Sequence, residues 1–179
     1  MARKLKTVEL NRLSVEEFKD AAKIPCVLVL DNIRSAYNVG SIFRTADGFL
    51  LEKIVLCGIT PQPPHKEIYK TAIGAEQSVE WRYTKDIAYT LEELKAQGYF
   101  VAALEQTSDS VLLPQWQWKQ GTKFALVLGN EVDGISDTAM PLCDAFIEIP
   151  QYGTKHSFNV AVAAGIFIWD MIKAITNEK

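Results

Sequence analysis

The sequence predicts an α/β protein in which a mostly parallel sheet is flanked by helices. Short runs rich in Val, Ile, Leu and aromatic residues alternate with segments whose apolar residues recur at helical spacing. Several of the runs are apolar at consecutive positions, as expected of parallel strands that are covered on both faces. The chain has 179 residues, of which 48% are hydrophobic, and this suffices for one domain with a sizeable core.

Six short runs are predicted as strands, because each is apolar and ends in polar or turn-forming residues. In chain order they are CVLVLDN from Cys26, KIVLCGI from Lys53, SVEWRYT from Ser78, YFVAALEQ from Tyr99, FALVLGN from Phe124 and AFIEIP from Ala145. The proline-rich segment GITPQPPHKEIY is predicted as a loop of about a dozen residues. A second loop, LPQWQWKQGTK, carries Trp116 and Trp118, which are expected to pack against the sheet edge; stacking on bases is the alternative.

Helical segments are predicted before and between these strands. Ser14 and Glu17 have the spacing of a capping box at the start of a first helix. Residues 38–50 and residues 86–98 have helical period, and the second of these segments ends at a glycine, a common C-cap. The residues after Ser136 predict one further short helix.

The last helix, predicted over residues 160–175, is apolar almost all the way round. Asp170 and Lys173 are its only charged residues. A surface helix ordinarily keeps one polar face. This helix is therefore expected to contact apolar surface on more than one side.

The net charge of −3 does not by itself indicate a nucleic-acid-binding protein. The beginning of the chain nevertheless holds four basic residues, Arg3, Lys4, Lys6 and Arg12. Such a patch either binds phosphate or is a solvated terminus, and composition alone does not decide between the two. We predict that residues 1–24 form a basic extension with a short helix and that residues 25–179 form a single domain.

No membrane span, secretory signal or metal site is predicted. The longest apolar segment is interrupted by charges, and the N-terminus lacks the apolar stretch of a signal peptide. Cys26, Cys57 and Cys143 lie far apart, and with two histidines no zinc-binding spacing can be written. We therefore expect a cytoplasmic protein whose Cys26 and Cys57 are buried free thiols.

Polar residues gather after three of the predicted strands, at the strand ends where open α/β sheets bind ligands. The first strand is followed by Asp31, Asn32, Arg34, Asn38, Gly40 and Arg44. The fifth strand is followed by Gly129, Asn130, Glu131, Asp133 and Gly134, and the sixth by Gly153, Ser157 and Asn159. Three clusters at equivalent strand ends predict one composite site.

Each cluster alone has a simpler interpretation. Asn38 fits a helix cap and Arg44 a solvated helix residue, while GNEVDG suits a turn. Ser157 and Asn159 are ordinary N-cap residues, and His156 beside Ser157 does not suggest a catalytic triad. The chain has neither a phosphate-binding loop that ends in Gly-Lys-Ser/Thr nor a G-x-G-x-x-G motif. It is the joint occurrence of the three clusters that predicts a site.

In order and internal spacing, the three clusters resemble the motifs of the SpoU (TrmH-like) family, RNA 2'-O-ribose methyltransferases of the SPOUT superfamily. NVGSIFRTADGF resembles the first motif, FALVLGNEVDGIS the second and IEIPQYGTKHSFNVAVAAGI the third, so that the resemblance runs from Val27 to Ile168. Two positions depart from the family pattern. Phe158 stands where Leu is usual, and Asn130 stands where many members have a small residue.

The resemblance implies an α/β fold with a C-terminal trefoil knot in which S-adenosylmethionine is bound. It also implies a homodimer in which the last helix packs against its partner, and this would explain why that helix is apolar on all sides. The implied partners are an RNA substrate and a second copy of the chain, with no metal and no membrane.

By similarity, the cofactor pocket is lined by Leu128, Gly129, Ile149, Ser157 and Phe158. The implied catalytic set is Arg44, Asn38, Glu131, Ser157 and Asn159. Within it, Glu131 is expected to hold Arg44 by a bidentate bond. A guanidinium stays protonated in proteins, so we assign Arg44 to the phosphate and developing alkoxide at the reactive ribose rather than to a general base. RNA contacts are expected from Arg3, Lys4, Lys6, Arg34, Arg44 and Lys155, with Lys66 and Lys70 as weaker candidates.

We therefore predict methyl transfer from S-adenosylmethionine to a ribose 2'-hydroxyl in structured RNA, with tRNA favoured over rRNA. One alternative is a non-catalytic RNA-binding relative with the same fold, against which the retained polar residues argue. Another is a small-molecule enzyme that binds a different nucleotide in the same crevice. Binding of S-adenosylmethionine distinguishes the last hypothesis from the first.

Overall fold

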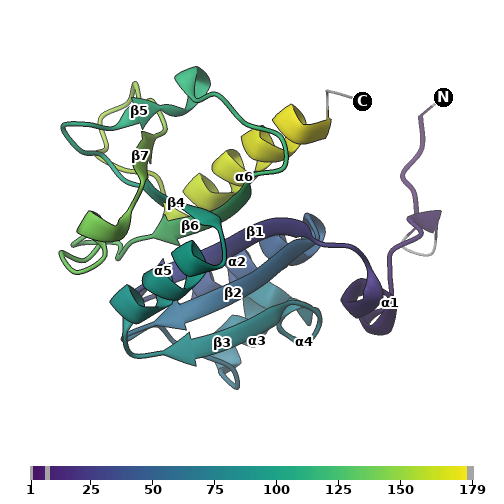
Figure 1. Cartoon of the computed structure of the whole chain (residues 1–179). Helices are drawn as coiled ribbons and strands as arrows, with labels where there is room; N and C mark the ends of the chain where they lie inside the picture. The colour runs from purple at the N-terminus through teal and green to yellow at the C-terminus, as the bar shows by residue number, and fades with distance from the viewer. Residues whose placement is uncertain (1, 7–8, 177–179) are drawn as a thin grey trace.

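The computed structural model describes residues 2–6 and 9–176, and its centre is a seven-stranded sheet (Figure 1). The strand order is β3-β2-β1-β6-β4-β7-β5, and every pairing between neighbours is parallel. The strands are β1 Ile24–Asp31, β2 Leu51–Cys57, β3 Glu80–Thr84, β4 Tyr99–Leu104, β5 Val111–Leu112, β6 Lys123–Leu128 and β7 Ala145–Glu148. The predicted α/β class is confirmed, and so are all six predicted strands. The sequence missed β5, because two residues are too few to produce a periodic signal.

The helices are α1 Val15–Asp20, α2 Ala36–Gly48, α3 Lys66–Ala72, α4 Ala75–Ser78, α5 Ile87–Ala96 and α6 Val160–Thr176. The predicted loop is shorter than expected, because α3 begins within it after His65. The imidazole of His65 accepts a hydrogen bond from the amide of Glu67, and histidine is not among the residues that ordinarily signal a helix start. The short helix expected after Ser136 is instead a 3-10 turn at Met140–Leu142, whose central proline has no amide hydrogen to donate.

Two separate hydrophobic clusters cover the two faces of the sheet. On one face, Leu28 and Leu30 of β1 pack with Phe43 of α2 and Phe167 of α6. On the other face, the alternate residues of β1 pack with α5. Cys26 and Cys57 are buried free thiols, as predicted, and burial raises the pKa of each thiol to about 12.

Helix α2 packs unusually closely against α3, because Gly40 leaves room for the facing backbone. A Cβ atom at Gly40 would lie 2.1 Å from Thr71 Oγ1 and 2.4 Å from the carbonyl oxygen of Ile68. The hydroxyl of Thr71 also donates to the carbonyl oxygen of Tyr37, at 3.0 Å. These contacts fix α2, which carries the first polar cluster, relative to α3.

The apolar helix α6 is held to the sheet by the loop that contains the two tryptophans. The Trp118 ring packs edge-on against Phe124 of β6 and Phe167 of α6, each with a centroid distance of 5.2 Å. Its indole nitrogen donates to Asp170 Oδ2 at 2.9 Å. Packing of Trp118 against the sheet is confirmed, but it packs on a face over the central strand β6 rather than at an edge as predicted. One of the two charges that interrupt α6, Asp170, thus has a partly buried partner.

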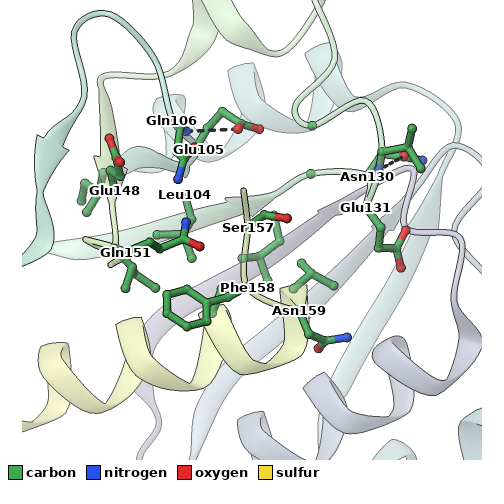
Figure 2. Close-up of a pocket in the computed structure, with 18 residues that line it drawn as sticks. Leu104, Glu105, Gln106, Asn130, Glu131, Glu148, Gln151, Ser157, Phe158 and Asn159 are labelled. Atoms are coloured by element: carbon green, nitrogen blue, oxygen red, sulfur yellow. Dashed lines mark hydrogen bonds between the residues drawn. The ribbon is translucent and has the colours of Figure 1, made fainter. Parts of the chain in front are cut away.

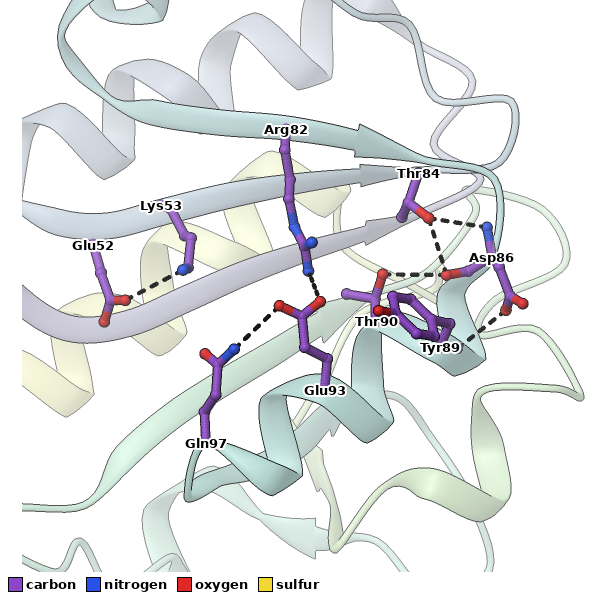
Figure 3. A network of polar contacts seen from close by, with 9 residues as sticks. All are labelled: Glu52, Lys53, Arg82, Thr84, Asp86, Tyr89, Thr90, Glu93 and Gln97. Atoms are coloured by element: carbon purple, nitrogen blue, oxygen red, sulfur yellow. Dashed lines mark hydrogen bonds and ion pairs between the residues drawn. The ribbon is translucent and has the colours of Figure 1, made fainter.

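At the far edge of the sheet, β3 is tied to α5 by a polar network (Figure 3). The Arg82 guanidinium donates to the carboxylate of Glu93 and lowers the pKa of that group, while Gln97 donates to the other oxygen at 3.1 Å. Asp86 caps α5 by accepting a hydrogen bond from the amide of Tyr89. Ion pairs as exposed as that of Arg82 and Glu93 add little stability, so we infer that the network mainly orients α5.

The close packing at Gly40 predicts that Gly40→Ala destabilises the fold. The overpacked methyl costs about 1–3 kcal/mol, more than the gain of up to about 1 kcal/mol in helix propensity, and a backbone oxygen is among the atoms that would have to move. Urea unfolding should show a net loss of about 1 kcal/mol or more. The matched control is Gly48→Ala in the same helix, where nothing lies within 4 Å of the new Cβ. Equal stability of the two variants would contradict the prediction.

Candidate functional site

The carboxyl ends of three adjacent strands, β6, β4 and β7, open into one cavity of about 360 Å³ (Figure 2). Residues after β4, β6 and β7 and the start of α6 line it. All five residues predicted to hold a cofactor are among the lining residues: Leu128, Gly129, Ile149, Ser157 and Phe158. The second and third polar clusters of the sequence therefore meet at one hollow of the kind in which ligands bind.

The first cluster joins the other two through Glu131 and Asn38. Glu131 Oε2 accepts a hydrogen bond from the backbone amide of Arg34 at 2.9 Å, and Oε1 accepts from the side-chain amide of Asn38 at 2.8 Å. Asn38 Oδ1 in turn accepts from Asn159 Nδ2 at 2.9 Å. Asn159 Oδ1 also caps α6 by accepting from the amides of Ala161 and Val162. One chain of hydrogen bonds thus connects all three clusters.

The cap of α2 is Ser35, whose hydroxyl accepts from the amide of Asn38. Asn38 is the third residue of the helix, so the interpretation of Asn38 as a simple cap is wrong. Asn159 does act as a cap, but the same side chain also reaches α2. An amide can fill both roles because it carries a donor and an acceptor.

The loop after β6 folds around Asn130, one of the two departures from the family pattern. Asn130 and Gly134 exchange both backbone hydrogen bonds, at 2.9 and 3.0 Å, and the side-chain oxygen of Asn130 accepts from the amide of Val132 at 2.8 Å. Its side-chain nitrogen donates to the carbonyl oxygen of Asn32 at 2.7 Å, which ties the loop to the end of β1. A Cβ atom at Gly129 would lie 2.4 Å from the backbone of Gly134, so only glycine fits there.

The model of the SpoU rRNA Methylase family matches residues 25–169, which is most of the chain. The chain belongs to this family. A relative from Neisseria meningitidis, 23S rRNA (guanosine-2'-O-)-methyltransferase RlmB, is 28% identical over 172 residues, which are 94% of this chain and 68% of that protein. The chain spans between 63% and 68% of the length of three curated relatives that it matches.

Solved structures of family members have the same fold. The A. aeolicus TrmH/SpoU tRNA modifying enzyme superposes with a TM-score of 0.79 at 24% identity, over 92% of this chain and 81% of that one. The S-adenosylmethionine-bound rRNA methyltransferase from Sinorhizobium meliloti superposes with a TM-score of 0.77 at 26% identity, over 87% of this chain and 59% of that one. The predicted resemblance to SpoU proteins is confirmed.

Three carboxylates also line the cavity, and the family motifs pointed only to Glu131. Glu105 Oε2 accepts from the amide of Ile135 at 3.0 Å, and Glu148 Oε2 accepts from the hydroxyl of Ser110 at 2.9 Å. Both residues lie at the carboxyl ends of strands, β4 and β7, that reach the same edge as β1 and β6. The sequence did offer a signal for Glu105, because the predicted strand YFVAALEQ ends in two polar residues, Glu105 and Gln106.

Arg44 lies apart from this cavity. It is six residues beyond Asn38 on α2, about 240° further round the helix axis, and its side chain is exposed. The prediction that Glu131 bonds to Arg44 is wrong. Both carboxylate oxygens of Glu131 accept hydrogen bonds from Arg34, Ser35 and Asn38 instead. The side chain of Arg44 has no hydrogen bond or ion pair within residues 2–6 and 9–176.

The predicted RNA contacts divide into paired and unpaired side chains. Arg3 is paired, since its guanidinium donates to both oxygens of Glu9, at 3.0 and 2.6 Å. Within the part of the chain that the structure describes, Lys4, Lys6, Arg34 and Lys155 are exposed and their side-chain nitrogens have no hydrogen-bond or ion-pair partner. The Ser157 hydroxyl, at the cavity, is likewise without a partner in these ranges.

Two absences apply to the described residues only. In residues 2–6 and 9–176, no group of three or more His, Cys, Asp or Glu side chains is arranged to hold a metal ion. The helices of these same ranges include none with the length and apolar content that crossing a membrane requires.

The pKa of Glu131 is lowered. Burial acts against this shift by disfavouring the charged form, but hydrogen bonds from the amide of Arg34, from Asn38 and from the amide of Ser35 outweigh it. The carboxylate also lies at the N-terminus of α2, where the helix dipole favours negative charge. Glu131 is therefore ionised at neutral pH and accepts all three bonds.

These bonds predict that Glu131→Gln is destabilising at neutral pH, by about 0.5–1 kcal/mol because the group is partly solvated. A carboxylate whose pKa is lower in the folded than in the unfolded protein stabilises the fold at any pH above its unfolded-state pKa, which is roughly 4.3 for Glu. This contribution is lost as the pH falls through the folded-state pKa. Urea unfolding should therefore give the wild type a higher free energy of unfolding than Glu131→Gln at pH 7, and this difference should disappear in acid.

The control for this comparison is Glu92→Gln on α5, an exposed residue whose side chain has no bond in the described ranges. It should leave stability unchanged at both pH values. A wild-type advantage over Glu131→Gln that persists in acid would show that the charge of Glu131 is not its source.

Proposed function

We propose that the protein transfers the methyl group of S-adenosylmethionine to a ribose 2'-hydroxyl of RNA, with S-adenosylhomocysteine and the proton of the hydroxyl as the other products. The observation that carries this proposal is the chain of hydrogen bonds through Glu131, Asn38 and Asn159, which joins the three motif clusters beside one cavity. Relatives named as RNA methyltransferases support it, among them the RlmB protein and the cofactor-bound enzyme from Sinorhizobium meliloti.

The cavity suits this cofactor in size and in chemistry. A volume of about 360 Å³ is within the usual range of ligand pockets. Leu128, Ile149 and Phe158 offer an apolar wall for the adenine, and Glu105 and Glu148 place negative charge near a cationic sulfonium. When bound, S-adenosylmethionine supplies an electrophilic methyl group, so the protein contributes mainly position and electrostatics.

The polar residues have distinct roles in this proposal. Glu131 holds Asn38, and Asn38 holds Asn159, so that the first turns of α2 and α6 are fixed next to the cofactor. The unpartnered hydroxyl of Ser157 is available to the ribose. Arg44 binds the phosphate beside the reactive ribose and stabilises the alkoxide that develops as the 2'-hydroxyl loses its proton.

We propose tRNA ahead of rRNA as the substrate, and the cytoplasm as the location. Relatives carry names of both kinds, since RlmB is a 23S rRNA methyltransferase and the A. aeolicus structure is a tRNA modifying enzyme. The trefoil knot implied by the family belongs to the same proposal. Residues 149–159 return from β7, near one edge of the sheet, to the cavity beside β6, and this supports a threaded C-terminal segment.

The test is methyl incorporation from labelled S-adenosylmethionine into unmodified bulk tRNA and rRNA in separate reactions, with the modified positions mapped by mass spectrometry. We expect a 2'-O-methyl nucleotide in tRNA. Arg44→Ala should lower the rate at least about a hundredfold, as for removal of one oxyanion donor, and should leave cofactor binding by calorimetry within about twofold.

The control variant for this assay is Lys119→Gln, an exposed cation in the loop before β6. It should methylate at the wild-type rate. Cofactor binding without incorporation into either RNA would favour a non-catalytic relative, and the absence of cofactor binding would overturn the proposed function altogether.

We also propose a homodimer through α6. Phe167, Ile168 and Met171 on one side of this helix are buried, whereas Val162 and Trp169 on another side are 52% and 59% exposed. Val162 and Trp169 are seven residues apart and therefore share a face. Gly165 between them would allow close approach, because it has no side chain and nothing within this chain lies within 4 Å of the place that a Cβ atom would take. Since α2 packs beside α6, a partner docked here would lie near Arg44 and bring a second cavity towards it.

The dimer predicts that Trp169→Glu is monomeric, because a buried unpaired charge would have to enter the interface. Light scattering should give the wild type twice the 20.0 kDa mass of one chain and the variant a single mass. The variant should also lose methyl transfer while it still binds the cofactor. Tyr89→Glu on α5, at a residue that is 62% exposed, is the matched control and should remain dimeric. A monomeric wild type would contradict the prediction.

A further inference from the structure

The face of α2 that carries Arg44 also carries an exposed aromatic ring. Tyr37, Ser41 and Arg44 are spaced at i, i+4 and i+7, so they form one stripe along the helix. Tyr37 is 42% exposed although it lies in the first turn of a helix whose other face is core. None of the three family motifs assigns a role to this side chain.

A lysine from α3 lies beside this ring. Lys70 Nζ is 5.7 Å from the centroid of the Tyr37 ring and donates to its hydroxyl at 3.3 Å. No carboxylate pairs with Lys70 in the described ranges. The backbone beneath is rigid, because Thr71 donates to the carbonyl oxygen of Tyr37 and Gly40 brings α2 and α3 into close contact. The ring and the ammonium group are thus held together on the surface of two packed helices.

Two hollows meet at Arg44, and both are cationic. One, of about 410 Å³, is lined by Ser41, Arg44 and Lys70; the other, of about 630 Å³, extends from Arg44 to Arg12 in the N-terminal segment. Asp47 is the only acid that lines either hollow among the described residues, and it accepts a hydrogen bond from the hydroxyl of Ser78. The side chain of Arg12, like that of Arg44, has no hydrogen bond or ion pair in these ranges.

We propose that Tyr37 and Lys70 form a binding platform for a nucleotide that neighbours the methylated one in a single-stranded RNA segment. The base stacks on the Tyr37 ring, the adjoining phosphate contacts Lys70, and the backbone continues past Arg44 towards Arg12. Aromatic rings next to a cationic track are how proteins hold single strands, since every base has a face that stacks and every phosphate a charge. A paired helix would hide its bases from the ring, so the segment is unpaired.

This inference rests on the proposed function, and it can be tested with a probe that needs no knowledge of the natural substrate. The probe is a labelled oligouridylate of about twelve nucleotides, with an RNA duplex of the same length as comparison. Binding is measured by fluorescence anisotropy from about 50 mM salt upwards. Calorimetric binding of S-adenosylmethionine is recorded for every variant, as a readout of the fold and of the proposed function.

We expect Tyr37→Ala to weaken oligouridylate binding about tenfold and to leave duplex binding within about twofold. Tyr37→Phe keeps the ring and should bind nearly as well as the wild type. Lys70→Gln should weaken binding of both probes and reduce the salt slope by about one, whereas Lys70→Arg should not. The matched controls are Tyr89→Ala on α5 and Lys119→Gln in the loop before β6, both exposed and both outside these hollows.

The platform is overturned if Tyr37→Ala binds oligouridylate within about twofold of the wild type, or if the wild type does not bind it at low salt. Equal losses on the duplex would overturn the assignment to a single strand. These failures are separate from failure of the proposed function. A chain that does not bind S-adenosylmethionine loses the methyltransferase proposal, whereas a chain that binds the cofactor but is insensitive to Tyr37 loses only the platform.

Discussion

The carboxylate of Glu131 is the interaction on which the geometry of the site depends. It comes from the loop after β6, yet it accepts hydrogen bonds from the amides of Arg34 and Ser35, which immediately precede α2, and from the side chain of Asn38. A single ionised group thereby fixes a loop, a helix N-terminus and, through Asn38, the start of α6. Because amides near a helix N-terminus have no partner within the helix, an anion at that position stabilises the helix while it positions the loop.

The same arrangement explains why the polar clusters are far apart in the sequence and close in space. Each cluster follows a parallel strand, and the carboxyl ends of parallel strands reach one edge of the sheet. Five of the residues that line the cavity were predicted from the family resemblance, and Glu105 and Glu148 were missed. The sequence itself predicted the edge of the sheet at which the cavity forms. It did so because strand ends are defined by composition, and composition can be read without coordinates.

What the sequence could not supply is the partner of each side chain. The motif set placed Glu131 with Arg44. Glu131 is instead bonded to the backbone just before α2 and to the side chain of Asn38, and Arg44 lies about 240° round that helix from Asn38. The period of a helix does predict that Asn38 and Arg44 lie on different sides of α2. Which of these two residues is turned towards the loop after β6 depends on how α2 packs. That packing is set in part by Gly40 against α3, and α3 itself went unpredicted because a histidine begins it.

A chain with a net charge of −3 can still present a cationic surface, because its charges are unequally paired. Arg82 and Lys95, on or near the face covered by α5, are bonded to Glu93 and Asp144. The arginines around α2 have no such partners in the described ranges, and the hollows between them contain one acid, already hydrogen-bonded by Ser78. Overall charge therefore says little about RNA binding here. What matters is which cations are left without a carboxylate partner. Two of them, Arg44 on α2 and Lys70 on α3, lie beside the exposed ring of Tyr37 or on the same stripe of α2.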